Sequence, residues 1–183
     1  MSKIDRLVES YRTHLRVPWR DDASPEERVI FCVYSETQEL HLRAKIPEFD
    51  LATHSVSHGW FEFDFTDTFA VWLSQLRYSE HYFERPDLIS SALDGYSRFL
   101  LGRFSSFLQN PDIGADSVVA LTGVAALFGL VKVRDVVATF APLVRGRLVV
   151  FFPGNYENNN YKLLNAYDGW NYLAVAITAD ADL

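Results

Sequence analysis

Runs of apolar residues without polar alternation predict buried strands at residues 29–34, 117–121 and 147–152. A strand that is apolar on both faces is typical of a parallel sheet covered by helices on either side. Residues 60–65 alternate apolar and acidic side chains with a period of two, which predicts a strand with one polar face. A fifth strand is predicted at residues 171–178.

Apolar residues spaced three and four apart between these strands predict helices. They cover residues 2–17, 39–57, 67–76, 86–109 and 134–143. The alternation of strands and helices predicts an α/β fold, a three-layer sandwich with a mainly parallel central sheet of about five strands. No composition break divides the chain, so residues 1–183 are expected to form one domain, with the helix of residues 1–17 packed on it.

The carboxyl ends of parallel strands are where such sheets bind ligands. A nucleotide-binding protein would carry a glycine-rich turn and a lysine after its first strand. Here that turn, residues 35–39, has no glycine, no lysine and two glutamates, and the third strand ends in Leu121-Thr122-Gly123 without a carboxylate. We therefore expect a P-loop-NTPase-like topology without a P-loop, and no cofactor.

Glu62, Asp64 and Asp67 form an acidic run at the end of the second strand. Carboxylates at a strand end can hold magnesium, as in nucleases, so a metal-dependent nuclease or phosphate-cleaving enzyme is the alternative function. Acidic residues also alternate along a strand simply because one of its faces meets water. We favour the second interpretation and expect no metal and no catalytic residues.

The composition excludes some classes of protein. Hydrophobic residues make up 49% of the chain and its net charge is −7, which excludes a disordered chain and argues against direct nucleic-acid binding. Arg12, Arg16 and Arg20 are spaced about four apart and could form a small basic ridge that contacts DNA. Acidic residues lie close to them in the sequence, so we favour the interpretation that these arginines are simply solvent-exposed helix residues. The single cysteine, Cys32, lies within a predicted strand and is expected to be a buried hydrophobic residue. No apolar stretch resembles a membrane span or a secretory leader, so a cytoplasmic protein is expected.

A polar segment rich in asparagine and tyrosine follows the fourth predicted strand, which is expected to stop at Pro153-Gly154. Asparagine side chains offer donors and acceptors that hold irregular loops, and tyrosine and tryptophan are frequent at protein contacts. Two interpretations are open. The segment could be a loop whose amide groups form hydrogen bonds within the loop and to the sheet, or it could be a partner-binding surface, and the two are compatible. The candidate partner-binding residues are Asn155, Tyr156, Glu157, Asn158, Asn159, Asn160, Tyr161 and Trp170, with Tyr167 and Tyr172 nearby.

Several motifs together resemble the BrxB family of bacteriophage exclusion (BREX) defence systems. The longest lies in the C-terminal part, and the likeness extends over nearly the whole chain. The motifs are Pro18-Trp19, Gly59-Trp60, Leu121-Thr122-Gly123-Val124, Leu127-Phe128-Gly129, residues 147–154, residues 156–161 and residues 168–174.

The resemblance implies a role in host DNA methylation and phage restriction that depends on partner proteins. The implied partners are other BREX proteins, first the PglZ phosphatase-like protein and then the AAA+ ATPase. The family brings no established enzymatic activity and no catalytic residues. We therefore expect a non-catalytic adaptor.

Overall fold

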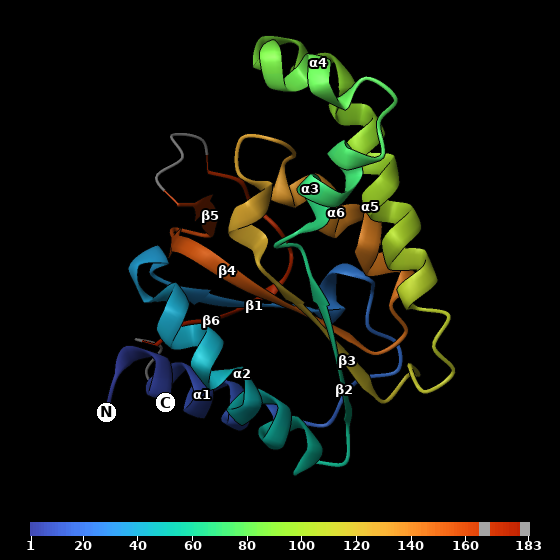
Figure 1. Ribbon diagram of the computed structural model, residues 1–183. Helices are drawn as coiled ribbons and strands as arrows, with labels where there is room; N and C mark the ends of the chain where they lie inside the picture. The colour runs from blue at the N-terminus through green and yellow to red at the C-terminus, as the bar shows by residue number, and fades with distance from the viewer. Residues whose placement is uncertain (165–168, 180–183) are drawn as a thin grey trace.

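The computed structural model describes residues 1–164 and 169–179, and its centre is a six-stranded sheet in the order β2-β3-β4-β1-β6, with β5 paired to β4 (Figure 1). The strands are β1 (Val29–Tyr34), β2 (Gly59–Asp64), β3 (Ser117–Thr122), β4 (Arg147–Glu157), β5 (Asn160–Leu163) and β6 (Val175–Ile177). All pairings are parallel except that of β4 with β5. The predicted α/β class with a mainly parallel central sheet is confirmed, and the structure supplies the strand order, with β3 and β4 between β1 and β2.

Successive side chains of each central strand enter different cores, because a strand presents alternate residues to opposite faces. On β1, Phe31 enters one core and Cys32 the other. Cys32 is fully buried, as expected, and burial raises the pKa of its thiol. The apolar runs therefore reflect a sheet that is covered on both faces.

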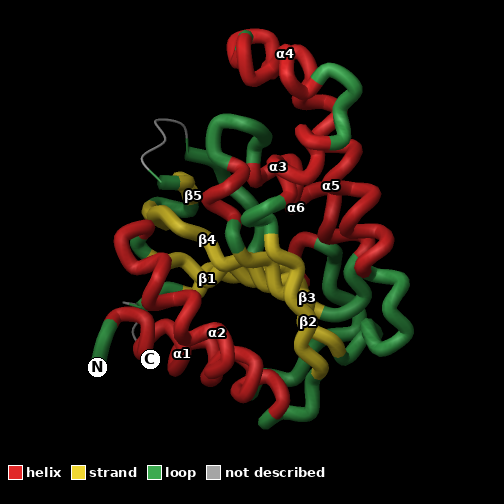
Figure 2. Tube along the Cα trace, viewed as in Figure 1, coloured by secondary structure: helices red, strands yellow, loops and turns green. Residues whose placement is uncertain are grey.

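Helices cover both faces of the sheet and complete the three layers (Figure 2). Helices α1 (Lys3–Leu15) and α2 (Glu39–His54) lie on one face, and α3 (Thr68–Ser74), α5 (Leu93–Phe107) and α6 (Val133–Phe140) lie on the other. Short 3₁₀ helices connect these elements: η1 (Glu26–Arg28), η2 (Glu36–Gln38), η4 (Val124–Leu127) and η5 (Ala141–Leu143). None of the helices in the described part of the chain is long and apolar enough to traverse a bilayer.

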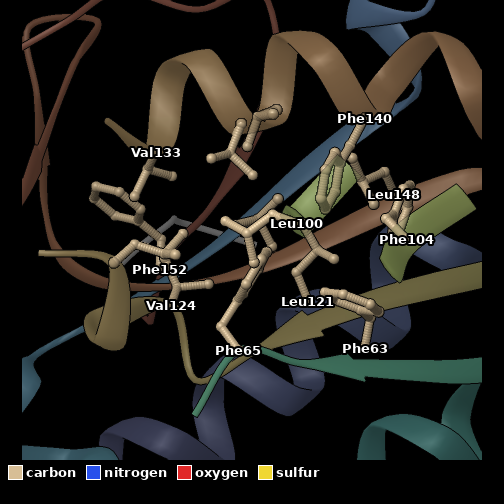
Figure 3. Packing of buried hydrophobic residues seen from close by; sticks show 14 of the residues in the cluster. Phe63, Phe65, Leu100, Phe104, Leu121, Val124, Val133, Phe140, Leu148 and Phe152 are labelled. Atoms are coloured by element: carbon tan, nitrogen blue, oxygen red, sulfur yellow. The ribbon is translucent and has the colours of Figure 1, made fainter. Parts of the chain in front are cut away.

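Stacked aromatic rings fill the core beneath α5 and α6 (Figure 3). Phe104 and Phe140 stack with their centroids 3.8 Å apart and their planes within 5°. Phe63 meets Phe104 edge-on at 5.3 Å. Such pairs add to the gain from burying their area and join two helices to the end of the sheet.

The structure corrects two strand predictions. Strand β4 does not stop at Pro153-Gly154 but continues to Glu157. Its last residues, from Gly154 onward, extend beyond the end of β1 and pair with β5 instead. The predicted strand at residues 171–178 is reduced to Val175–Ile177. Proline has no N–H to donate, and at Pro153 the pairing of β4 with β3 has already ended, at Val150.

The predicted helix of residues 86–109 is also corrected. Its first part, Pro86–Ala92, is the 3₁₀ helix η3, and the α-helix begins only at Leu93. The Ser91 hydroxyl donates to the Leu88 carbonyl at 2.7 Å, a local hydrogen bond that competes with the α-helical pattern. A short helix that was not predicted, α4 (Ser79–Glu84), precedes η3 and stands away from the sheet (Figure 1).

Candidate functional site

The carboxyl ends of β1 and β2 open onto a pocket of about 320 Å³ whose lining includes Tyr34, Glu39, Arg43, Glu62 and Asp64. This is where a P-loop protein would hold phosphate. The turn after β1 enters η2 and then α2, so Glu39 and Arg43 lie one helical turn apart on the same face.

Glu39 is held by two donors. The buried Tyr34 hydroxyl donates to its Oε2, and Arg43 Nε donates to its Oε1 at 2.7 Å. Burial raises the pKa of Tyr34, and the Glu39 carboxylate raises it further. The same carboxylate raises the pKa of Arg43. Both groups therefore keep their protons and act as hydrogen-bond donors to the Glu39 side chain.

The network continues to the loop after β2. Arg43 Nη2 donates to Thr66 Oγ1 at 3.0 Å, and Thr66 Oγ1 donates to Asp64 Oδ1 at 2.6 Å. The Thr66 backbone N–H donates to the same Asp64 oxygen at 2.9 Å. Gly123, which follows β3 with φ of 67°, lies directly against this turn.

This arrangement does not provide a phosphate site. Glu39, Glu62 and Asp64 outnumber the single cation, Arg43, so the pocket repels an anion. The guanidinium already donates to Glu39 and Thr66. The turn after β1 lacks the glycines and the lysine of a phosphate loop, and the polar side chains at this position form hydrogen bonds with one another instead.

The acidic run is not gathered into a ligand set. Glu62 accepts from Trp60 Nε1 at 2.9 Å, Asp64 accepts from Thr66, and Asp67 precedes α3 on the surface. Within residues 1–164 and 169–179, no group of three or more His, Cys, Asp or Glu side chains could hold a metal ion.

The asparagine-rich segment forms a β-hairpin rather than an irregular loop. Glu157 pairs with Asn160, and Asn158 and Asn159 form the two-residue turn between them. Their φ angles of 50° and 62° lie in the left-handed region that a type I′ turn requires and that asparagine tolerates. The alternating side chains around an Asn-Asn pair were the signal for this hairpin, and the sequence reasoning missed it.

The hairpin separates the candidate partner-binding residues into two groups. Asn155, Glu157, Asn158, Asn159 and Asn160 are exposed. The group at its base is apolar and packed: Tyr161 is fully buried and Trp170 is half-buried. Only the first group forms a free surface.

Aromatic contacts explain the burial at the base. Trp170 and Tyr161 lie 5.2 Å apart and both contact Phe31 of β1, at 5.6 and 4.5 Å. Their backbones form a two-way bridge, with N···O distances of 2.8 and 3.0 Å. Half-buried Tyr156 donates to Asn159 Oδ1 at 3.1 Å across the turn. Tyr167 lies outside the described residues.

The basic ridge is largely neutralised. Arg12 pairs with Glu9, and Arg20 pairs with Asp22 at 3.1 Å. Two of the three arginines of the ridge are thus paired with acidic neighbours and Arg16 is exposed, which reduces the positive charge that the ridge offers to a phosphate backbone.

Comparisons with known proteins add no relative: no family model, curated protein or solved structure matches the chain.

Proposed function

We propose that the chain is a non-catalytic adaptor of a BREX anti-phage defence complex, needed for host DNA methylation and phage restriction because it binds partner proteins in the cytoplasm. The PglZ phosphatase-like protein is the first expected partner and the AAA+ ATPase the second. The motifs that resemble the BrxB family support this assignment. The exposed aromatic residues of one projecting segment support the binding role.

The projecting segment, residues 75–92, is here called the arm. It contains α4 and η3 and stands away from the sheet (Figure 1). None of its residues is buried, although several are apolar. Tyr78 and Phe83 in particular expose 65% and 67% of their surface. Exposed aromatic residues on a projecting segment are typical of contact sites, because burying them against a partner removes apolar area from water. This is the observation on which the proposal depends.

The carboxyl edge supports a role without chemistry. Its polar side chains bond to each other from Tyr34 to Asp64, and the pocket there carries excess negative charge. The exposed hairpin tip (Asn155 and residues 157–160) is a second candidate contact.

The test is co-purification of the tagged chain with PglZ and with the AAA+ ATPase. We expect the Tyr78→Ser/Phe83→Ser variant to lose at least tenfold of the bound partner at an unchanged melting temperature, because neither side chain supports the core. Leu51→Ser is the matched control, since Leu51 is an equally exposed apolar residue on α2, at 68%. An Asn155→Ala/Glu157→Ala variant tests the hairpin tip in the same assay.

Two results would contradict the proposal. One is that the wild-type chain captures neither partner, or that the arm and tip variants both bind as well as Leu51→Ser. The other is DNA cleavage by the purified chain with magnesium or manganese that disappears in Asp64→Asn. The latter would establish the metal-dependent enzyme instead.

A further inference from the structure

A buried arginine lies at the opposite edge of the sheet, where the strands begin. Arg147, the first residue of β4, is only 9% exposed. Its guanidinium donates to the carbonyl oxygens of Gly146 and Arg20, both at the long distance of 3.4 Å. It also lies over the indole ring of Trp19, 4.6 Å from the centroid. No carboxylate among the described residues forms an ion pair with it.

Trp19 is fixed in place by a second ring. The imidazole of His58 stacks on it with centroids 3.6 Å apart and planes within 6°. The three side chains come from the loop after α1, the loop before β2 and the start of β4. The guanidinium is therefore held by a preformed platform.

The electrostatic surroundings leave Arg147 without a direct counter-charge. Burial lowers its pKa, the neighbouring Arg28 guanidinium lowers it further, and Asp21 acts in the opposite direction. Burial and Arg147 together lower the pKa of His14. A buried charge is normally paired with an opposite one, since its desolvation is otherwise uncompensated.

Arg147 lines a pocket of about 320 Å³, here called the amino-edge pocket. Its walls are mainly apolar and include Val17, Trp19, Ile30, Leu173 and Val175. Val17 and Leu173 expose 60% and 77% of their surface at its rim. The pocket thus combines one buried cation with apolar surface that remains in water.

We propose that the amino-edge pocket binds a carboxylate carried on an apolar body, with the Arg147 guanidinium as its ion-pair partner. A planar guanidinium matches a carboxylate through paired N–H donors. The apolar body would cover the rim residues Val17, Leu173 and Val175. This site lies at the other edge of the sheet from the network of Tyr34 and Asp64, and it does not depend on the proposed adaptor role.

The charges near the pocket favour one negative charge over two. Glu27 lines the pocket and Asp21 lies close enough to affect Arg147. Arg20, the other lining arginine, is paired with Asp22. A phosphate dianion would meet these carboxylates with only one unpaired guanidinium facing it, whereas a carboxylate matches that single charge.

The experiment titrates the purified full chain with N-acetyl-leucine and with its neutral analogue N-acetyl-leucinamide. Binding is followed by the NMR signal of the Trp19 indole, assigned with Trp19→Phe. A second arm uses acetyl-Gly-Gly-Val-Leu with a free or an amidated C-terminus. We expect saturable shifts with the acids and at least tenfold weaker binding of the amides, in one arm or in both.

Variants locate the site. Arg147→Met should weaken acid binding at least tenfold, whereas Arg103→Met, which removes an exposed arginine over Phe99 on α5, should leave it unchanged. Leu173→Asp places a negative charge at the exposed rim of the pocket, so it should weaken acid binding without lowering the melting temperature. If Arg147→Met does not fold, this variant tests whether the acid binds in the amino-edge pocket.

Binding of the free acid alone would identify a small carboxylic acid as the ligand source, and binding of the peptide alone a polypeptide C-terminus. Equal binding of acids and amides, no shift of the Trp19 signal, or full affinity in folded Arg147→Met would overturn the proposal.

Discussion

The hydroxyl groups of Tyr11 and Thr53 lie 2.7 Å apart in the buried layer between α1 and α2. Thr53 Oγ1 also donates to the Phe49 carbonyl at 2.8 Å, which uses its only hydrogen. Tyr11 must therefore be the donor to Thr53. The two helices are joined by a directed chain of hydrogen bonds from Tyr11 to Phe49.

This direction makes the two single substitutions unequal. Thr53→Val leaves the buried Tyr11 donor without an acceptor and should lower the free energy of unfolding by about 1–3 kcal/mol. Tyr11→Phe leaves Thr53 bonded to Phe49 and should cost only about 0.5–1.5 kcal/mol. Urea denaturation measures both. A larger loss in Tyr11→Phe than in Thr53→Val would show that the donor assignment is wrong.

Gly123 allows the turn around Asp64 to close. A β-carbon at position 123 would lie 2.3 Å from Asp64 Oδ1 and 2.9 Å from the Thr66 backbone nitrogen, and the φ of 67° adds strain. Gly123→Ala should therefore destabilise the fold by about 1–3 kcal/mol. The control is Gly102→Ala on α5, where nothing lies within 4 Å of the added carbon. It should gain about 0.5–1 kcal/mol in a helix, as measured by thermal or urea unfolding.

The hairpin turn depends on backbone angles rather than on buried amides. Asn159 is exposed and has a φ of 62°, so Asn159→Val should cost about 1–2 kcal/mol, because a β-branched residue resists the left-handed region. Asn159→Gly should stay within about 0.5 kcal/mol of wild type. Asn160→Val, the same change one residue later in β5, should be tolerated. Similar losses for the two valine variants would argue against a type I′ turn.

Asp5 makes the stability of the N-terminal helix depend on pH. The Ser2 backbone N–H donates to its carboxylate at 2.8 Å, and Lys45 Nζ lies 3.0 Å from it. These contacts, the Ser2 hydrogen bond first, hold the pKa of Asp5 below its usual range. The unfolded chain, with an Asp pKa of about 3.9, therefore takes up the proton first.

The stabilisation from the charged Asp5 is accordingly present above about pH 4 and is lost as the pH falls toward the folded pKa. The difference in unfolding free energy between wild type and Asp5→Asn should be greatest near neutral pH and shrink below about pH 4. Urea titrations at a series of pH values measure it. A difference that does not change with pH would contradict this account.

Local patterns in the sequence determined the α/β class, the four longest strands and the burial of Cys32 within β1. Apolar runs and periods report how each segment is buried, and burial on both faces is sufficient to predict a covered parallel sheet. The sequence also shows directly that no glycine-lysine turn follows Tyr34, because a phosphate loop is a local motif. Arg43 could have been found with Glu39, since the two are four residues apart on a predicted helix.

The tertiary structure alone decided what depends on strand order. The Arg147 guanidinium reaches the Arg20 carbonyl across 127 positions of the chain, and Trp19 meets His58 only because both loops end at the same edge of the sheet. The continuation of β4 beyond Pro153 likewise required its partner strand β5. Periodicity describes one segment at a time, whereas these contacts arise from how separate segments are placed side by side, and that placement is set by packing of the whole chain.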